Sequence, residues 1–213
     1  MKKIRKSGKL VHGVGVNDAD YNVCPIVDGK VVSCPYYDRW AKMLRRCYSK
    51  KFHKTGKTYV DCVVCEEWKT FSRFKMWMET QNWEGMDLDK DLLSNSKTYS
   101  PDTCVFIPAS INRVLQLSDA SRGRLPVGVT QSSRYSYLAR CGISGERKRI
   151  GVYPTPQLAH KAWQLAKVEA IRCLVDIAVD VRVKESLCNV IGYLLDDISC
   201  GKVTTNLNLR GNE

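Results

Sequence analysis

The chain has 213 residues and a formal net charge of +12, from 34 Lys and Arg against 22 Asp and Glu. Hydrophobic residues make up 44% of the sequence, which is enough to bury a core and excludes a globally disordered chain. No apolar run approaches the roughly 20 residues that span a bilayer, and the basic start lacks a signal-peptide core. We therefore expect no membrane partner, no secretion and a cytoplasmic protein whose ten cysteines are reduced.

The first part of the chain predicts an irregular start and then an amphipathic helix. Residues 1–35 contain only two short strand-like runs around the turn Asp28-Gly29. Helical spacing then extends over residues 36–48, and a basic loop follows at 50–57. The side chains expected on the buried face of this helix are Tyr36, Trp40, Met43, Leu44 and Cys47.

The middle of the chain predicts a second helix, a strand pair and a short third helix. The second helix is expected at 67–80, and its core-facing side chains are Trp68, Phe71, Phe74 and Met78. Residues 88–92 and 104–107 could pair as a hairpin, and a short helix begins at 110. A polar, glycine-containing stretch at 118–125 marks the expected domain boundary.

The last part of the chain predicts three strands and two helices. The strands are expected at 127–130, 136–143 and 148–153, with a turn at 144–146 between the last two. Thr155 can cap the following helix, and Pro156 suits its first position. That helix is expected to pack on the sheet through Ala159, Ala162, Trp163, Ala166 and Ala170. A final helix at 183–198 is expected to bury Leu187, Ile191, Leu194 and Leu195.

These last elements carry a set of motifs in a fixed order. The motifs are Gly128-Val129, Tyr137-Leu138-Ala139-Arg140, Arg149-Ile150-Gly151-Val152-Tyr153, Thr155 and the run from Ala159 to Trp163. Together they resemble an AP2 domain over the length typical of that family. Tyr137, Ile150 and Trp163 replace the family's usual residues but keep aromatic or aliphatic character. The resemblance implies that residues 126–176 form a DNA-binding, three-stranded antiparallel sheet packed on one helix.

One face of such a sheet is left free for a ligand. Its alternate residues are basic or aromatic, and the candidates for contact with double-stranded DNA are Arg134, Tyr137, Arg140, Arg147 and Arg149. Tyr137 and Arg140 stand as alternatives, because they differ in strand parity. Arginine forks can pair with guanine edges or phosphates in the major groove. The alternative to DNA binding is that these arginines form a solvated outer face. Charge and fold together favour nucleic-acid binding. RNA is a further alternative to DNA as the ligand.

A second set of ordered motifs lies in residues 36–117. It comprises Trp40, Met43-Leu44, Arg46-Cys47-Tyr48, Val64-Cys65-Glu66-Glu67-Trp68, Leu88-Asp89-Lys90-Asp91, Tyr99-Ser100-Pro101-Asp102-Thr103-Cys104 and Asn112. This set resembles the HNH-type, ββα-metal nucleases that occur beside AP2 domains in bacteriophage genes and homing endonucleases. The resemblance implies an endonuclease that hydrolyses DNA phosphodiesters, in the host cytoplasm if the gene belongs to a phage.

The same resemblance implies catalytic roles for Asp89, Asp91 and Asn112. Asp89 and Asn112 are expected to hold Mg²⁺ or Mn²⁺, since such cations prefer oxygen ligands. No histidine lies between His53 and His160, although many nucleases of this class use one as general base. The chain could therefore be a catalytically inactive DNA-binding regulator with the same two folds. The alternative for residues 89–91 is that they form a charged strand edge without a catalytic role.

The cysteines allow one further site. Cys47, Cys62, Cys65 and Cys104 could supply four thiolates to a structural Zn²⁺, with Cys34 as a substitute for one of them. The chain has only one Cys-x-x-Cys knuckle, and free cysteine is often buried in cores, so a core role is the alternative. The whole chain is thus predicted to be α+β: residues 1–35 irregular, 36–117 HNH-like, 126–176 AP2-like, and 181–213 a further helix and tail.

Overall fold

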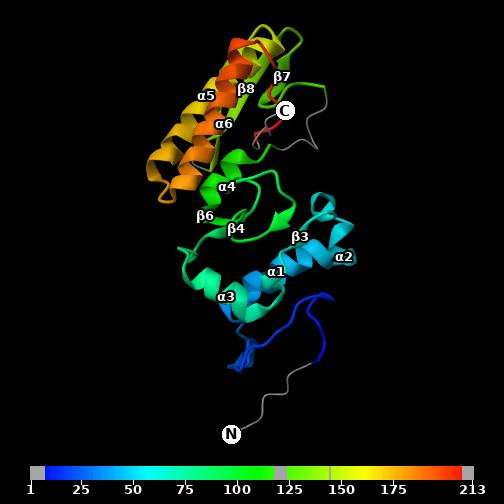
Figure 1. The fold of residues 1–213 in the computed structure, drawn as a ribbon. Coiled ribbons are helices and arrows are strands. Elements are labelled where there is room, and N and C mark those ends of the chain that lie inside the picture. Colours follow the sequence, from blue (N-terminus) through cyan, green and yellow to red (C-terminus); the bar gives the residue numbers. More distant parts are fainter. Residues whose placement is uncertain (1–7, 118–123, 144, 208–213) are drawn as a thin grey trace. The chain divides into compact units, whose positions relative to one another are not determined.

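The computed structural model describes residues 8–117, 124–143 and 145–207. It confirms the α+β class, with helices and several small sheets (Figure 1). The chain divides into two compact units. The first unit comprises Met1–Lys90 and Ser96–Phe106, and the second comprises Asp91–Asn95 and Ile107–Glu213. None of the helices in the described part of the chain has the length and apolar character that a membrane crossing requires.

The first unit begins with a two-residue hairpin. Strands β1 (Ile26–Val27) and β2 (Lys30–Val31) pair antiparallel around Asp28 and Gly29. These two residues have φ of 50° and 74°, and two positive φ values at the centre of a turn match the right-handed twist of paired strands. The turn predicted from Asp28-Gly29 is therefore confirmed.

The aromatic core of the first unit joins two helices. Helix α1 (Pro35–Tyr48) buries Trp40, and the 3-10 helix η2 (Glu67–Lys69) followed by α3 (Phe71–Glu79) provides the opposite wall. The indole Nε1 of Trp40 donates a hydrogen bond of 2.6 Å to the carbonyl of Trp68, so this polar atom stays satisfied inside the core. The inward face expected for the second helix is confirmed, since Trp68, Phe71, Phe74 and Met78 are all buried.

The region expected to be a basic loop is instead regular structure. It forms helix α2 (Lys50–His53) and the 3-10 helix η1 (Lys57–Tyr59). Ser49 accepts a hydrogen bond from the backbone N–H of Phe52, so it caps α2. The loop prediction failed because this capping contact outweighs the poor apolar periodicity of so short a segment.

Four short strands complete the first unit. Strand β3 (Val63–Val64) pairs in parallel with β5 (Thr98–Tyr99). Strand β4 (Asp87–Asp89) pairs with β6 (Val105–Ile107), whose last residue begins the second unit's share of the chain. The pairing expected between the segments around 88–92 and 104–107 is confirmed, with β5 inserted between them in sequence.

The second unit contains the three-stranded sheet. Strands β7 (Val129–Ser133), β8 (Ser136–Ile143) and β9 (Glu146–Tyr153) are antiparallel and lie in that order. Helix α5 (Pro156–Ile177) covers one face of the sheet (Figure 1). The Thr155 hydroxyl accepts the N–H of Leu158 at 3.2 Å, and Pro156 opens the helix, as expected. Ser144 of the predicted turn and residues 118–123 of the predicted boundary lie outside the described residues.

Two more helices pack against α5. Helix α6 (Val181–Ser199) lies along it, and α4 (Ala109–Leu115) is tied to it by a 2.8 Å hydrogen bond from Lys167 Nζ to the Val114 carbonyl. Leu187 and Leu194 are buried as expected, whereas Leu195 is 41% exposed and its expected burial is wrong. The buried side chains of α6 include Val183 and Val190 instead, because α5 packs on the side of α6 that carries them.

Candidate nucleic-acid interface and nuclease-like residues

The free face of the three-stranded sheet, called here the outer face, lies opposite α5. Ala139 of β8 is completely buried toward the helix, so the next residue, Arg140, points the other way. Arg140 stands directly across from Arg149 of β9, and Arg147 stands across from Gly142. Arg147 and Arg149 are two positions apart on one strand, so they share a face. The register therefore gathers three arginines on the outer face.

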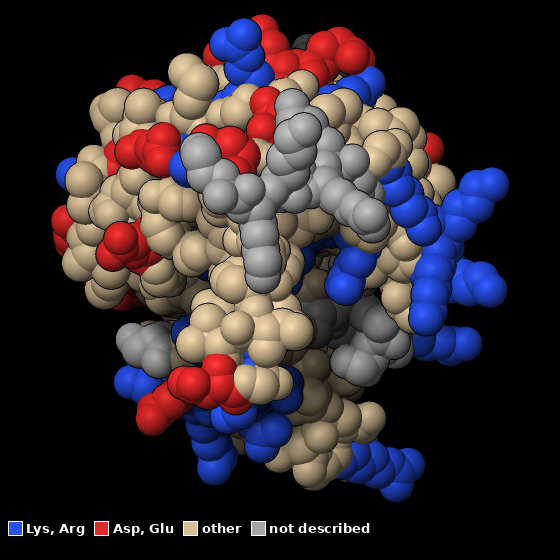
Figure 2. Space-filling model, turned by 90° about the horizontal axis from the view of Figure 1, so that it is seen from below, with Lys and Arg blue, Asp and Glu red and all other residues tan. Residues whose placement is uncertain are grey.

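These arginines are exposed, and the one acidic residue beside them on β9 is Glu146, which precedes Arg147. Within the described part of the chain, none of Arg140, Arg147 and Arg149 forms an ion pair within 4 Å. Like charges that face each other across two strands destabilise a sheet. The Arg140 and Arg149 pair thus carries a repulsion that an anionic ligand would relieve. Lysine and arginine side chains that project from the surface are shown in Figure 2.

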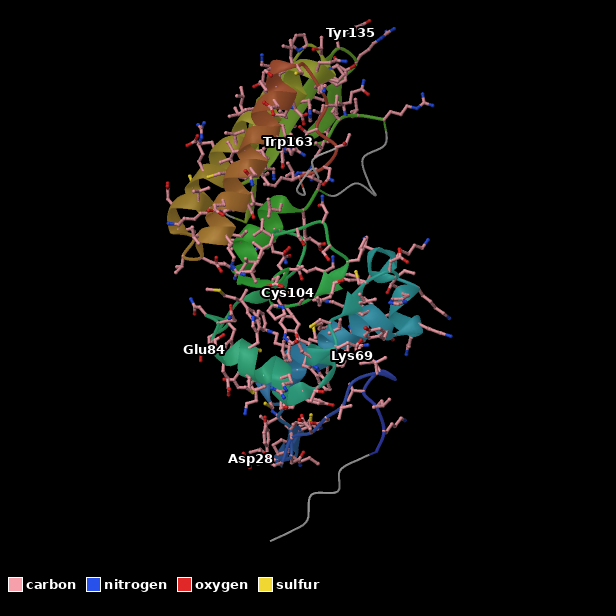
Figure 3. All side chains as sticks on the ribbon, in the orientation of Figure 1. Asp28, Lys69, Glu84, Cys104, Tyr135 and Trp163 are labelled. Carbon is pink, nitrogen blue, oxygen red and sulfur yellow. The ribbon has the colours of Figure 1, made fainter. Side chains whose placement is uncertain are left out.

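The β7–β8 hairpin adds a cation and an aromatic ring at its tip. The Arg134 guanidinium lies 5.3 Å from the centre of the Tyr135 ring, within the range of a cation–π contact. Tyr135 is 73% exposed and stands at the end of the hairpin (Figure 3). A large exposed aromatic beside a cation can stack on a base or pack against a sugar. The sequence interpretation missed Tyr135, whose place in the turn between two expected strands was the available signal.

Tyr137 does not belong to the outer face. It packs with Val129, Ala139 and Ala159 in the small core between sheet and helix. β8 alternates regularly, so Tyr137 shares the inner face with Ala139 and Arg140 lies on the outer face. The bulge at this point adds Ile150 on β9 and brings Arg149 opposite Arg140. Of the five candidate DNA contacts, the structure therefore brings Arg140, Arg147 and Arg149 together, places Arg134 at the hairpin tip, and separates Tyr137 from them.

The sheet and α5 meet at Gly128. This residue has φ of 79°, and a Cβ atom there would lie 2.0 Å from Cδ1 of Trp163. Its carbonyl accepts the N–H of Arg140 at 2.8 Å. Only glycine combines this left-handed backbone with so close an approach of an indole ring. The Gly128 and Trp163 contact thus fixes the position of the strand that carries Arg140.

The three nuclease-like residues belong to different parts of the chain. Asp89 ends β4 in the first unit and is half-buried. Asp91 is exposed and, like Asn112 on α4, belongs to the second unit. The Asn112 Oδ1 accepts a hydrogen bond of 3.1 Å from Gln116 Nε2. Carboxylate and amide oxygens suit Mg²⁺ chemically, and the roles of these three residues stay predictions.

Two residues near the expected site have structural partners. The His53 Nε2 lies 2.8 Å from the Arg46 carbonyl, and because a carbonyl only accepts, this nitrogen carries the proton. His53 therefore closes the end of α1. Thr103, which stands where the nuclease family has asparagine, donates from Oγ1 to the Thr98 carbonyl at 2.6 Å. That bond joins the first residue of β5 to the turn that leads into β6.

The candidate zinc cysteines lie in or beside the core of the first unit. Cys47, Cys62 and Cys104 are buried, and Cys65 is half-buried. Burial raises the pKa of Cys47 and of Cys104 to about 12, so both are thiols at neutral pH. Among the described residues, no three His, Cys, Asp or Glu side chains are grouped as a metal site. Zinc and magnesium binding stay predictions.

Comparison of the chain with protein-family models, with curated proteins and with solved structures gives no match. The AP2-like and HNH-like interpretations therefore rest on the residues of this chain and on their arrangement. In the second unit, the three antiparallel strands and the Thr155 helix cap lie where the sequence predicted strands and a helix start.

Proposed function

We propose that the protein binds double-stranded DNA through the outer face of β7–β9. The observation that carries the proposal is the cross-strand pair of Arg140 and Arg149, exposed and without an acidic partner among the described residues. Arg147 extends the same face. The overall charge of +12 agrees with a polyanionic ligand.

A sheet of this kind has the dimensions to enter a major groove. The groove of B-DNA is about 12 Å wide and admits a two-stranded ribbon. Arginine guanidinium groups can pair bidentately with the O6 and N7 atoms of guanine or with phosphate oxygens. In the bound complex, β8 and β9 present their arginines to the groove, and the hairpin tip with Arg134 and Tyr135 contacts the neighbouring backbone.

Binding is tested by the fluorescence anisotropy of a labelled duplex. The variant Arg140→Gln/Arg149→Gln keeps the sheet but removes two guanidinium forks, and each fork is worth about 1–3 kcal/mol if it binds. The variant is expected to bind at least about tenfold more weakly than the unmodified protein. A matched control, Lys161→Gln/Lys202→Gln, removes two exposed charges from α5 and the tail. Equal affinities of the variant and the control would refute the proposal.

A second candidate activity is hydrolysis of DNA phosphodiesters by the HNH-like region. The favouring observation is the pairing of β4 with β6, followed along the chain by α4, with Asp89 at the end of β4. This is the ββα element order that the resemblance implies. Asp89 would be a ligand for Mg²⁺ or Mn²⁺, which would supply Lewis acidity at a phosphate.

Cleavage is tested with supercoiled plasmid DNA. The full chain is incubated with Mg²⁺, with Mn²⁺ or with EDTA, beside Asp89→Asn and a control variant at an exposed acid, Glu84→Gln. Metal-dependent nicking that is lost in Asp89→Asn and kept in Glu84→Gln is the expected result. DNA binding without any cleavage would leave the inactive regulator as the function.

A further inference from the structure

The first unit carries its own concentration of positive charge. Between Asp38 and Asp61 the sequence has no acidic residue. Six of the cations in this interval are exposed. Lys42 pairs with Asp38, and the other five together are called the basic corner: Arg45, Lys50, Lys51, Lys54 and Lys57. Within the described part of the chain, none of the five forms an ion pair.

The backbone beneath the basic corner is a built structure. His53 closes the end of α1, and Ser49 caps α2. The N–H of Gly56 donates to the Phe52 carbonyl at 2.9 Å, and a Cβ at Gly56 would lie 2.6 Å from the Phe52 ring. The Phe52 ring also meets the Tyr59 ring, with centroids 5.7 Å apart. The lysines of the corner thus project from α2, from the residue that ends it and from η1.

One cation of the corner is oriented by an aromatic ring. The Arg45 guanidinium lies 5.1 Å from the centre of the Phe52 ring. A contact of this kind restrains the guanidinium without using its N–H donors in hydrogen bonds. A planar, oriented fork is the group that recognises a phosphate with two hydrogen bonds.

Local helix electrostatics account for only part of this charge. Arg45 lies in the last turn of α1, where the helix dipole favours a cation. Lys50 and Lys51 lie in the single turn of α2, so a helix dipole accounts for neither. The pKa of His12 is lowered by partial burial and then by the charge of Arg45, which reports the local positive field.

We propose that the basic corner is a second DNA contact, which grips the phosphate backbone without reading sequence. The proposal rests on the proposed function in that both surfaces take double-stranded DNA. Lysines are compact point charges suited to phosphates, whereas the outer-face arginines can also read base edges. The corner therefore adds affinity and salt dependence rather than specificity, because each neutralised phosphate releases counterions.

The salt dependence of binding tests the corner directly. The logarithm of the association constant is plotted against the logarithm of the salt concentration for the full chain and for Lys50→Gln/Lys51→Gln/Lys54→Gln. Three lost phosphate contacts would reduce the slope by up to roughly 2.7. The matched control Lys30→Gln/Arg73→Gln/Lys97→Gln removes three exposed charges elsewhere in the first unit. A corner variant whose slope equals that of the control would overturn the proposal.

Lysine acetylation of the unmodified chain gives a second test that requires no variant. With saturating duplex DNA, Lys50, Lys51 and Lys54 are expected to be protected, while Lys30 is acetylated as in the free protein. Acetylation of the corner unchanged by DNA would overturn the inference. Stronger competition by duplex RNA than by DNA would also overturn it.

The failures of the two proposals are distinguishable. If the outer-face variant binds like the unmodified protein while the corner variant is weakened, the proposed sheet interface fails and the corner stands. If the outer-face variant is weakened while the corner variant binds like the unmodified protein, the corner proposal fails and the sheet interface stands.

Discussion

The substitution Gly128→Ala tests the contact that holds the three-stranded sheet on α5. The new Cβ would lie 2.0 Å from Cδ1 and 2.2 Å from Cγ of Trp163, distances that require the strand or the indole to move. Overpacking of this kind costs about 1–3 kcal/mol. The backbone φ of 79° adds about 1–2 kcal/mol for a residue with a side chain. We therefore expect the second unit to lose about 2–5 kcal/mol of unfolding free energy.

Two control variants separate the two causes. Gly201 also has positive φ, 63°, but has open space around its Cβ position, so Gly201→Ala should cost only the backbone part. Gly192 lies in α6 with nothing nearby, and alanine there should stabilise the helix by about 0.5–1 kcal/mol. Urea denaturation followed by hydrogen exchange of β8 peptides gives the three free energies. A Gly128→Ala loss no larger than that of Gly201→Ala would refute the packing argument.

Three further predictions follow from buried or titrating groups. Arg45→Gln removes a nearby positive charge, so NMR titration should show the pKa of His12 rise toward 6.5. An unchanged pKa would show that the charge of Arg45 does not act on His12. The Cys47 and Cys104 thiols keep their protons to pH about 12 in the folded chain, while unfolded thiols release them near 9.0. The unfolding free energy should therefore fall as pH rises from 9 toward 12, and urea denaturation at pH 8 and 10.5 measures the fall. Thr204→Val removes a 2.8 Å hydrogen bond to the buried Asp197 carboxylate of α6. Urea denaturation should show that the second unit loses about 1.5–3 kcal/mol of unfolding free energy. A loss below about 0.5 kcal/mol would show that this bond contributes little to stability.

The second unit was the more predictable part of the fold because its signals are local. Thr155 and Pro156 mark the helix start by the chemistry of capping, and alternation over 136–143 marks a strand. Alternation placed Tyr137 and Arg140 on opposite faces, but only the packing of α5 on Ala139 shows which of the two faces is covered. Leu195 was misplaced for a related reason, since the buried stripe of α6 depends on the angle at which α5 meets it.

The candidate sites depend more strongly on contacts between distant residues. The exposure of Arg140 follows from strand parity, but that of Arg149 and the direct opposition of the two depend on the bulge at Ile150 and the register of β8 and β9. The hydrogen bond from His53 to α1 spans seven residues and has no sequence signature, so the basic corner was predicted as a loop. Asp89 was placed on a strand correctly, and its catalytic role stays a prediction.

The most direct test of the central claim is photo-cross-linking of the full chain to duplex DNA, followed by mapping of the cross-linked peptides. The proposed interface predicts cross-links in residues 133–153, with Tyr135 at the hairpin tip among the modified positions. Cross-links confined to α6 or to the β1–β2 hairpin, with none on β8 or β9, would contradict DNA binding by the outer face of the sheet.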